Sequence, residues 1–147
     1  MDFLALLPHT PPMRLVQEVV SVAPGQQAIC RRTTAPDDFY FQGHFPNQPV
    51  VPAIVLIELL AQTGGLAAGT PEPGAPLVPR ALRVAAVDGC RFPAGCGAGV
   101  VLEATARVVG KMGSLFKIEG TVTADGTLVA KGSLTLADVV RSAPRER

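Results

Sequence analysis

The chain has 147 residues, of which 48% are hydrophobic and 17% are charged, and its formal net charge is +1. This balance is typical of a globular protein and excludes a disordered chain. The near-neutral charge argues against nucleic-acid binding as the main function. The longest apolar stretch is shorter than the ~20 residues that cross a bilayer, and the start "MDFLALLPH" lacks the pattern of a signal peptide. We therefore expect one domain over residues 1–147, located in the cytoplasm and not bound to membranes.

The three cysteines, Cys30, Cys90 and Cys96, are an odd number without a paired spacing. This pattern favours free thiols in a reducing compartment over a disulfide framework.

The first half of the chain predicts two strands and one long helix. Residues 2–7 predict a short helix that ends at Pro8. Residues 14–22 and 26–34 predict two strands around a Pro-Gly turn. A helical turn and a loop follow in "APDDFYFQGHF", and the long helix runs from Pro52 to about residue 67, because proline suits the first helical position and Gly64-Gly65 lies near the end.

The second half alternates between apolar and polar residues, which indicates strands. A proline-rich connection, "GTPEPGAPLVP", leads into a strand in "RALRVAAVDGCRF". Alternation follows in residues 102–108, 116–123 and 128–136, and the last of these places Leu128, Ala130, Leu134 and Leu136 on one face. Asp125-Gly126 predicts a hairpin between the last two strands. The expected fold is α+β: a bent antiparallel sheet of about six strands wrapped around one buried helix.

One acidic side chain stands out in this apolar helix. Between Pro52 and Ala61 the only polar residue is Glu58, and Gln62 lies one turn further on the same face. A buried, unpaired carboxylate would cost several kcal/mol, so Glu58 needs a partner, a proton or a cavity. An ion pair with a strand arginine, such as Arg83 or Arg91, is the structural alternative.

A histidine and three evenly spaced prolines precede the helix in "GHFPNQPVVPA". The prolines predict a stiff spacer between His44 and the helix. A backbone carbonyl of this segment could accept a hydrogen bond from one ring nitrogen of His44 and leave the other nitrogen free as a base. The N–H of Ala53 at the helix start is a candidate donor to an oxyanion. Base, acid and oxyanion donor together suit β-elimination of water beside a carbonyl, although a loop histidine such as His44, taken alone, is more often a surface or turn residue.

The segment "FYFQGHFPNQPVVPAIVLIELLAQTGG" resembles the signature of FabZ-type 3-hydroxyacyl-[acyl carrier protein] dehydratases, which have the hotdog fold. In that family the pattern is Phe-Phe-x-Gly-His-Phe-Pro-x-x-Pro-Val-x-Pro-Gly, followed by Ile-Glu-Ala-x-Ala-Gln. The segment "LLPHTPPMRLVQEV" resembles the family's Leu-Pro-His start, and "VDGCRF" and "GSLFKIEGTVTADGTLVAKGSLTLA" resemble its last strands. The resemblance covers most of the chain.

The resemblance implies dehydration of (3R)-hydroxyacyl chains on acyl carrier protein to trans-2-enoyl chains, in fatty-acid or related biosynthesis. His44 would abstract the α-proton, and Glu58 of a second subunit would protonate the leaving hydroxyl. Ala53, Gln62 and Val50 would bind the substrate in an apolar tunnel. The resemblance implies no metal and no organic cofactor, and it implies a homodimer with shared active sites, with a trimer of dimers as a further assembly.

Two departures and three rival functions accompany this interpretation. Ala53 replaces the family's glycine, and "RFPAGCGAGV" lacks the prolines and the aspartate of the corresponding family loop. Arg91, Lys111 and Lys117 are candidates to meet the acidic carrier protein. The rivals are a hotdog thioesterase, an enoyl-CoA hydratase and a non-catalytic acyl-binding subunit.

Overall fold

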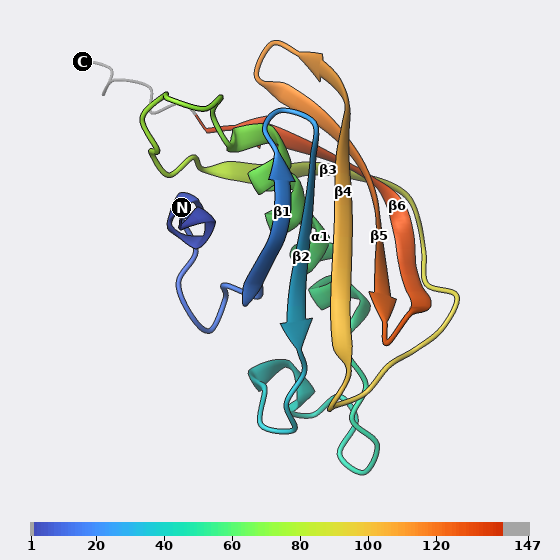
Figure 1. Cartoon of the computed structure of the whole chain (residues 1–147). Helices are drawn as coiled ribbons and strands as arrows, with labels where there is room; N and C mark the ends of the chain where they lie inside the picture. The colour runs from blue at the N-terminus through green and yellow to red at the C-terminus, as the bar shows by residue number, and fades with distance from the viewer. Residues whose placement is uncertain (1, 140–147) are drawn as a thin grey trace, which may run out of the picture.

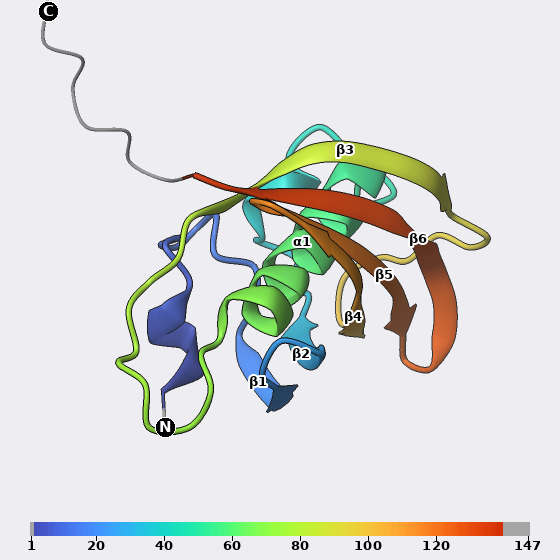
Figure 2. The same cartoon turned by 90° about the horizontal axis from the view of Figure 1, so that it is seen from above.

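A six-stranded antiparallel sheet bends around one long helix in the computed structural model, which describes residues 2–139 (Figure 1). The view from above shows the curved sheet wrapped over α1, with β3 and β6 arching across it (Figure 2). The elements in chain order are η1 (Phe3–Leu6), β1 (Glu18–Ala23), β2 (Gln27–Thr33), η2 (Phe39–Phe41), α1 (Ala53–Gly69), β3 (Leu82–Arg91), β4 (Val101–Met112), β5 (Leu115–Ala124) and β6 (Thr127–Asp138). The predicted fold class is confirmed.

The strand order is β1-β2-β4-β5-β6-β3, so β1 and β3 are the edge strands. Short hairpins join β1 to β2, β4 to β5 and β5 to β6. The predicted hairpin at Asp125-Gly126 is confirmed, and both residues have positive φ angles, 47° and 87°, as the tight hairpin turn requires. Strand β3 instead crosses to the far side of the sheet and pairs with β6, which leaves its outer edge open.

Helix α1 contacts all six strands, because its apolar residues point toward the sheet over most of its length. It begins after Pro52, whose φ and ψ of −60° and 142° are extended, and it ends where the N–H of Thr70 bonds to the carbonyl of Leu66. Burial is incomplete at the first turn. Ala53 is exposed, and Ile54 is 75% exposed, so the expectation of burial on every side is wrong there.

Gly120 lets the helix approach the sheet closely. A Cβ atom at this position of β5 would lie 2.5 Å from a methyl group of Leu60 on α1 and 2.5 Å from the carbonyl oxygen of Thr105 on β4. The contact with the Thr105 backbone cannot be relieved by a change of rotamer. The absence of a side chain at Gly120 therefore sets the distance between helix and sheet.

The three cysteines are free, as the sequence predicts. Cys30 is buried under the helix, and burial raises the pKa of its thiol to about 11. Within residues 2–139, no helix combines the length and hydropathy that a membrane span needs.

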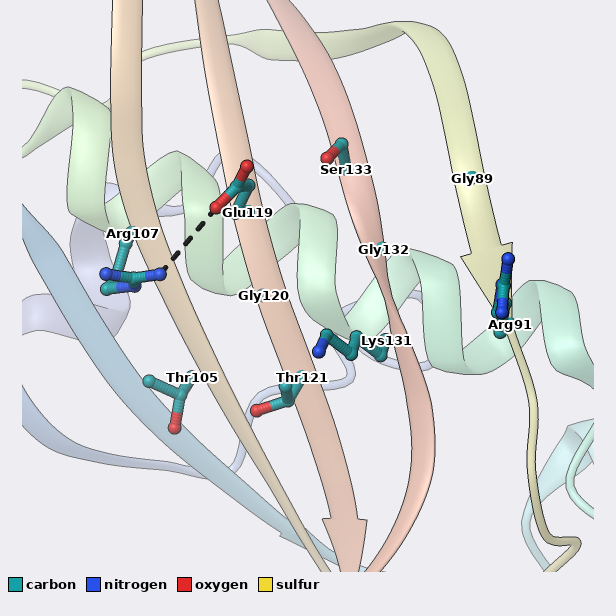
Figure 3. A pocket seen from close by; sticks show the side chains of 10 residues that line it. All are labelled: Gly89, Arg91, Thr105, Arg107, Glu119, Gly120, Thr121, Lys131, Gly132 and Ser133. Atoms are coloured by element: carbon teal, nitrogen blue, oxygen red, sulfur yellow. Dashed lines mark ion pairs between the residues drawn. The ribbon is translucent and has the colours of Figure 1, made fainter.

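The outer face of the sheet carries a polar hollow of about 440 Å³ (Figure 3). Gly89, Gly120 and Gly132 contribute only backbone to its lining. Arg107 on β4 pairs with Glu119 on β5 at 3.6 Å, whereas Arg91 and Lys131 are directly opposite on β3 and β6. This hollow contains none of the predicted catalytic or substrate-binding residues.

Gly120→Ala should destabilise the protein by about 2 kcal/mol, because the added methyl group would overlap backbone. Gly65→Ala is the matched control: it lies in α1 with nothing within 4 Å of its Cβ position, and alanine favours a helix by up to ~1 kcal/mol. Urea unfolding measures both. Equal stability of the two variants would contradict the close approach of Gly120 to its neighbours.

Candidate functional site

The N-terminal end of α1 borders a hollow of about 400 Å³ that contains three predicted site residues, His44, Val50 and Ala53. The other lining residues are Val51, Leu56 and the loop Phe92, Pro93, Ala94 and Gly95. The loop belongs to the segment that departs from the family pattern, so this departure lines the same hollow as His44.

The ring of His44 is held in one tautomer by the backbone. Its Nδ1 lies 2.9 Å from the carbonyl oxygen of Val50. Because a carbonyl oxygen can only accept, Nδ1 carries the hydrogen and Nε2 keeps a free lone pair. The predicted carbonyl partner is confirmed, and it leaves a base at Nε2.

The segment after His44 closes on itself through backbone hydrogen bonds. The N–H of Phe45 donates to the carbonyl of Gln48 (3.2 Å), and the N–H of Gln48 donates back to Phe45 (3.0 Å). The N–H of Val50 donates to the carbonyl of His44 at 2.9 Å. These bonds form a tight loop that fixes both the backbone and the ring of His44.

Ala53, which carries the first free amide of α1, lines the same hollow. Ala53 is the first residue of the helix, and the first four N–H groups of a helix have no partner within it. Among residues 2–139 no acceptor bonds to the N–H of Ala53. The N-terminal helix dipole adds a partial positive charge there, so a carbonyl oxygen in this hollow would be polarised.

Glu58 lies in a second, smaller hollow of about 240 Å³ between α1, β3 and the N-terminal segment. Its Oε1 accepts from Nε2 of Gln62 at 3.0 Å and lies 3.4 Å from Nε2 of His9. The ion pairs of the described chain include none between Glu58 and an arginine. The alternative partners Arg83 and Arg91 are therefore wrong: Arg83 lines the same hollow without pairing, and Arg91 lies on the outer face.

Gln62 is 1% exposed and uses its whole amide within the chain. Its Oε1 accepts from the N–H groups of Leu15 (2.9 Å) and Val16 (3.4 Å). Its Nε2 donates to the carbonyl of Met13 (2.7 Å) and to Glu58. An amide has two donors and two acceptor positions, so a polar group of a substrate would have to displace one of these partners. Substrate binding by Gln62 stays a prediction.

His44 and Glu58 do not meet within one chain. No residue of the described chain lines both hollows. Ala53 and Glu58 are five positions apart on α1, which corresponds to a rotation of about 140° and a rise of about 7.5 Å. Glu58 therefore lies on a different side of α1 from Ala53, which shares its hollow with His44.

Comparison with known proteins gives this geometry a context. The family model described as "FabA-like domain" matches residues 7–133. The chain is 34% identical over 137 residues to the 3-hydroxyacyl-[acyl-carrier-protein] dehydratase FabZ of Roseiflexus sp. (strain RS-1), with 92% of this chain and 93% of that protein covered. It is 36% identical over 139 residues to the protein of the same name from Myxococcus xanthus, covering 95% and 90%.

The chain belongs to the FabZ-type 3-hydroxyacyl-[acyl-carrier-protein] dehydratase family. Among solved structures, the dehydratase heterocomplex ApeI:P from Xenorhabdus doucetiae aligns with a TM-score of 0.82 at 19% identity, covering 96% of this chain and 93% of that one. A hypothetical thioesterase with coenzyme A from Streptococcus pneumoniae aligns with a TM-score of 0.64 at 11% identity, covering 86% and 88%. At sequence identities this low, the two structural alignments show that the hotdog fold is shared and nothing more.

Sequence reasoning missed a buried polar network behind the His44 loop of this FabZ-type chain. Arg32 on β2 lies 2.9 Å from Oδ1 of Asp38, donates to the hydroxyl of Tyr40 at 3.1 Å and donates to the carbonyl of Leu15 at 3.1 Å. Tyr40 donates to Asp38 in turn. The available signal was the strand period, because Arg32 occupies an inward position of β2 after Ala28 and Cys30.

The network shifts the pKa values of its members, including Tyr40 and Asp38. Burial and the hydrogen bond to Asp38 raise the pKa of Tyr40 to about 12. Burial acts to raise the pKa of Asp38, but the hydrogen bonds from Tyr40 and the Ala35 N–H, together with Arg32, outweigh it and hold that pKa below its ordinary value. Asp38 is therefore ionised and bound near neutral pH, and it ties the η2 segment before His44 to β2.

Asp38→Asn should destabilise the fold by roughly 3 kcal/mol at pH 7, because buried Arg32 loses its counter-ion. A lowered folded-state pKa means that the stabilisation is present above the unfolded pKa of about 3.9 and is lost as pH falls through the folded value. The difference from the wild type should therefore shrink as the pH falls below about 4 in urea unfolding. Asp37→Asn, at an exposed neighbour, is the control, and an equal effect at Asp37 would contradict the network.

Proposed function

We propose that this protein dehydrates (3R)-3-hydroxyacyl-[acyl carrier protein] to trans-2-enoyl-[acyl carrier protein] and water, in fatty-acid or related acyl-chain biosynthesis. One observation carries the proposal in the structure: a histidine with Nδ1 bound to a backbone carbonyl shares a hollow with the first free amide of a helix. The relatives named 3-hydroxyacyl-[acyl-carrier-protein] dehydratase support the same reaction.

The proposed reaction begins with removal of the α-proton by Nε2 of His44. The thioester oxygen becomes negative as the Cα–H bond breaks, and the N–H of Ala53 donates to it. Glu58 then protonates the β-hydroxyl, which leaves as water while the Cα–Cβ double bond forms. The acyl chain lies against apolar residues of the His44 hollow, with Val50 among them. The reaction as written needs no metal or organic cofactor.

The acid must come from a second copy of the chain, because His44 and Glu58 lie in separate hollows. Two features support a homodimer. Strand β3 is an open edge with mostly exposed residues, and an unpaired edge is a template for pairing. Large apolar side chains are exposed nearby, namely Phe45, Ile54, Val87 and Phe92. A trimer of dimers is the further assembly of this proposal.

The proposed partner is acyl carrier protein, whose acidic surface would meet basic side chains. Of the three residues predicted for this contact, Arg91 lines the outer-face hollow, Lys117 lies on β5, and the amine of Lys111 lies 5.4 Å from the ring centre of Phe116. A cytoplasmic location belongs to the same proposal, and the free cysteines support it. The proposed function involves neither a nucleic acid nor a membrane.

The function is tested by incubating the protein with a 3-hydroxyacyl thioester and following the absorbance of the conjugated enoyl thioester. Dehydration should be rapid with a carrier-bound substrate and slower with the coenzyme A analogue. Release of free thiol would instead identify a thioesterase, a preference for coenzyme A substrates would identify an enoyl-CoA hydratase, and binding of acyl chains without turnover would identify a non-catalytic subunit.

His44→Ala and Glu58→Gln should each abolish turnover, whereas an equal mixture should recover about a quarter of the wild-type rate if subunits exchange at random. Half of the dimers are then mixed, and each mixed dimer has one of its two shared sites intact. Rates are measured after co-expression, with sedimentation to establish dimers or hexamers. A mixture as inactive as the single variants would show that the two residues do not act across an interface.

Ala53→Pro should lower kcat about 100-fold, because it removes one oxyanion donor. Proline is tolerated at the first helical position, and Pro52 already has the extended conformation that a following proline requires. The thermal midpoint should therefore change little. Ala53→Gly keeps the N–H group and is the control, and activity of Ala53→Pro equal to that of Ala53→Gly would exclude this donor.

A further inference from the structure

The Leu-Pro-His segment near the N-terminus brings a second histidine to the proposed acid. His9 lines the Glu58 hollow, and its Nε2 lies 3.4 Å from Oε1 of Glu58. The same oxygen accepts from Nε2 of Gln62 at 3.0 Å. Both contacts fall on one oxygen of the carboxyl group, whereas the described chain places no hydrogen bond or ion pair on Oε2.

Bonds on both sides of His9 hold it in place. The N–H of Arg80 donates to the carbonyl of Leu6 (3.4 Å), and the N–H of Arg14 donates to the carbonyl of Thr10 (2.9 Å). Beyond these, the Gln62 amide binds the backbone of Met13 and Leu15. The side chain of His9 is 25% exposed and that of Glu58 is 29% exposed, so the pair is mostly shielded from water.

We propose that His9 is a positioning residue: with Gln62 it holds Oε1 of Glu58 as the accepting oxygen and leaves Oε2 to carry the proton that is transferred. This inference rests on the proposed dehydration. A protonated carboxyl group has one O–H donor and one carbonyl acceptor. A proton on Oε1 would face two N–H donors, so it resides on Oε2.

The proton balance is complete. Oε2 gives its proton to the β-hydroxyl as the C–O bond breaks, and water leaves with the bonding electron pair. Glu58 is then a carboxylate that accepts from two N–H groups, and His44 holds the α-proton. Transfer of this proton back to Glu58 through solvent restores both groups for the next turnover.

The positioning role requires one tautomer of His9. Its Nε2 must carry a hydrogen in order to donate to Glu58. Its Nδ1 is buried and has no hydrogen-bond partner among the described residues, and an unpaired buried lone pair is less unfavourable than an unpaired buried N–H group. Two cationic side chains, Arg80 and Arg83, line the same hollow. Arg80 is bound to Asp138 at 2.6 Å.

The chain has only two histidines, and they are assigned opposite tautomers. Nitrogen NMR of ¹⁵N-histidine-labelled protein should show one ring with hydrogen on Nδ1, for His44, and one with hydrogen on Nε2, for His9. The His9→Phe variant identifies which signals belong to which ring. This measurement does not depend on turnover, and an Nε2 without hydrogen in His9 would overturn the inference even if dehydration is confirmed.

His9→Phe should lower kcat roughly 10- to 100-fold, as expected for a misplaced catalytic group, with KM changed less than about twofold. His9→Gln, whose Nε2 can replace the lost donor, should restore most of the rate. Thr10→Val, at an exposed neighbour, is the control and should match the wild type. Equal losses in the Phe and Gln variants, with a lowered thermal midpoint, would show a structural role only.

The tautomer measurement separates this inference from the proposed function, because it needs no turnover. An Nε2 without hydrogen in His9 would overturn the positioning role. Absence of dehydration in the wild type would instead overturn the proposed function, and the tautomer measurement would still decide whether His9 donates to Glu58.

Discussion

The four hydrogen bonds of the Gln62 amide join the segment before β1 to α1 and to the side chain of Glu58. They fix the backbone of residues 13–16 against α1, and they direct Glu58 from one helical turn away. Because the amide is 1% exposed, loss of any one partner leaves a buried polar group unpaired, which costs about 1–3 kcal/mol. The placement of His9 and the shape of the Glu58 hollow both depend on this anchor.

Different kinds of interaction hold the two ends of the proposed site in place. At the His44 end, backbone bonds close a short loop and fix one ring tautomer, and Arg32, Asp38 and Tyr40 secure the segment that precedes it. At the Glu58 end, side chains supply the orientation. Within one chain the two ends lie in separate hollows, and in the proposed mechanism a second chain supplies the acid.

The sequence predicts most of the fold because its strongest signals are local. Pro52 marks the start of α1, and Asp125-Gly126 marks the turn between β5 and β6. The errors arise where tertiary contacts override the local pattern. Strand β1 begins at Glu18 and not at Arg14, because the N–H groups of Leu15 and Val16 bond to Gln62.

The pattern of β6 gives a second example. The alternation places Leu128 on the apolar face, but Leu128 is partly exposed and Val129 is buried. The pairing of β5 with β6 shifts between Val122 and Thr123, and a one-residue shift moves side chains to the opposite face. The contact between His9 and Glu58 joins residues 49 positions apart through an irregular segment, so no local periodicity could reveal it.

The facing cations on the outer sheet have a consequence for handling the protein. Arg91 and Lys131 are directly opposite on β3 and β6, and neither forms an ion pair within residues 2–139. Like charges in this position repel, and dissolved salt screens exposed charges over a Debye length of about 10 Å at 0.1 M. We therefore expect the pairing between the end of β3 and β6 to be less stable in dilute buffer than at moderate ionic strength, where salt screens the repulsion.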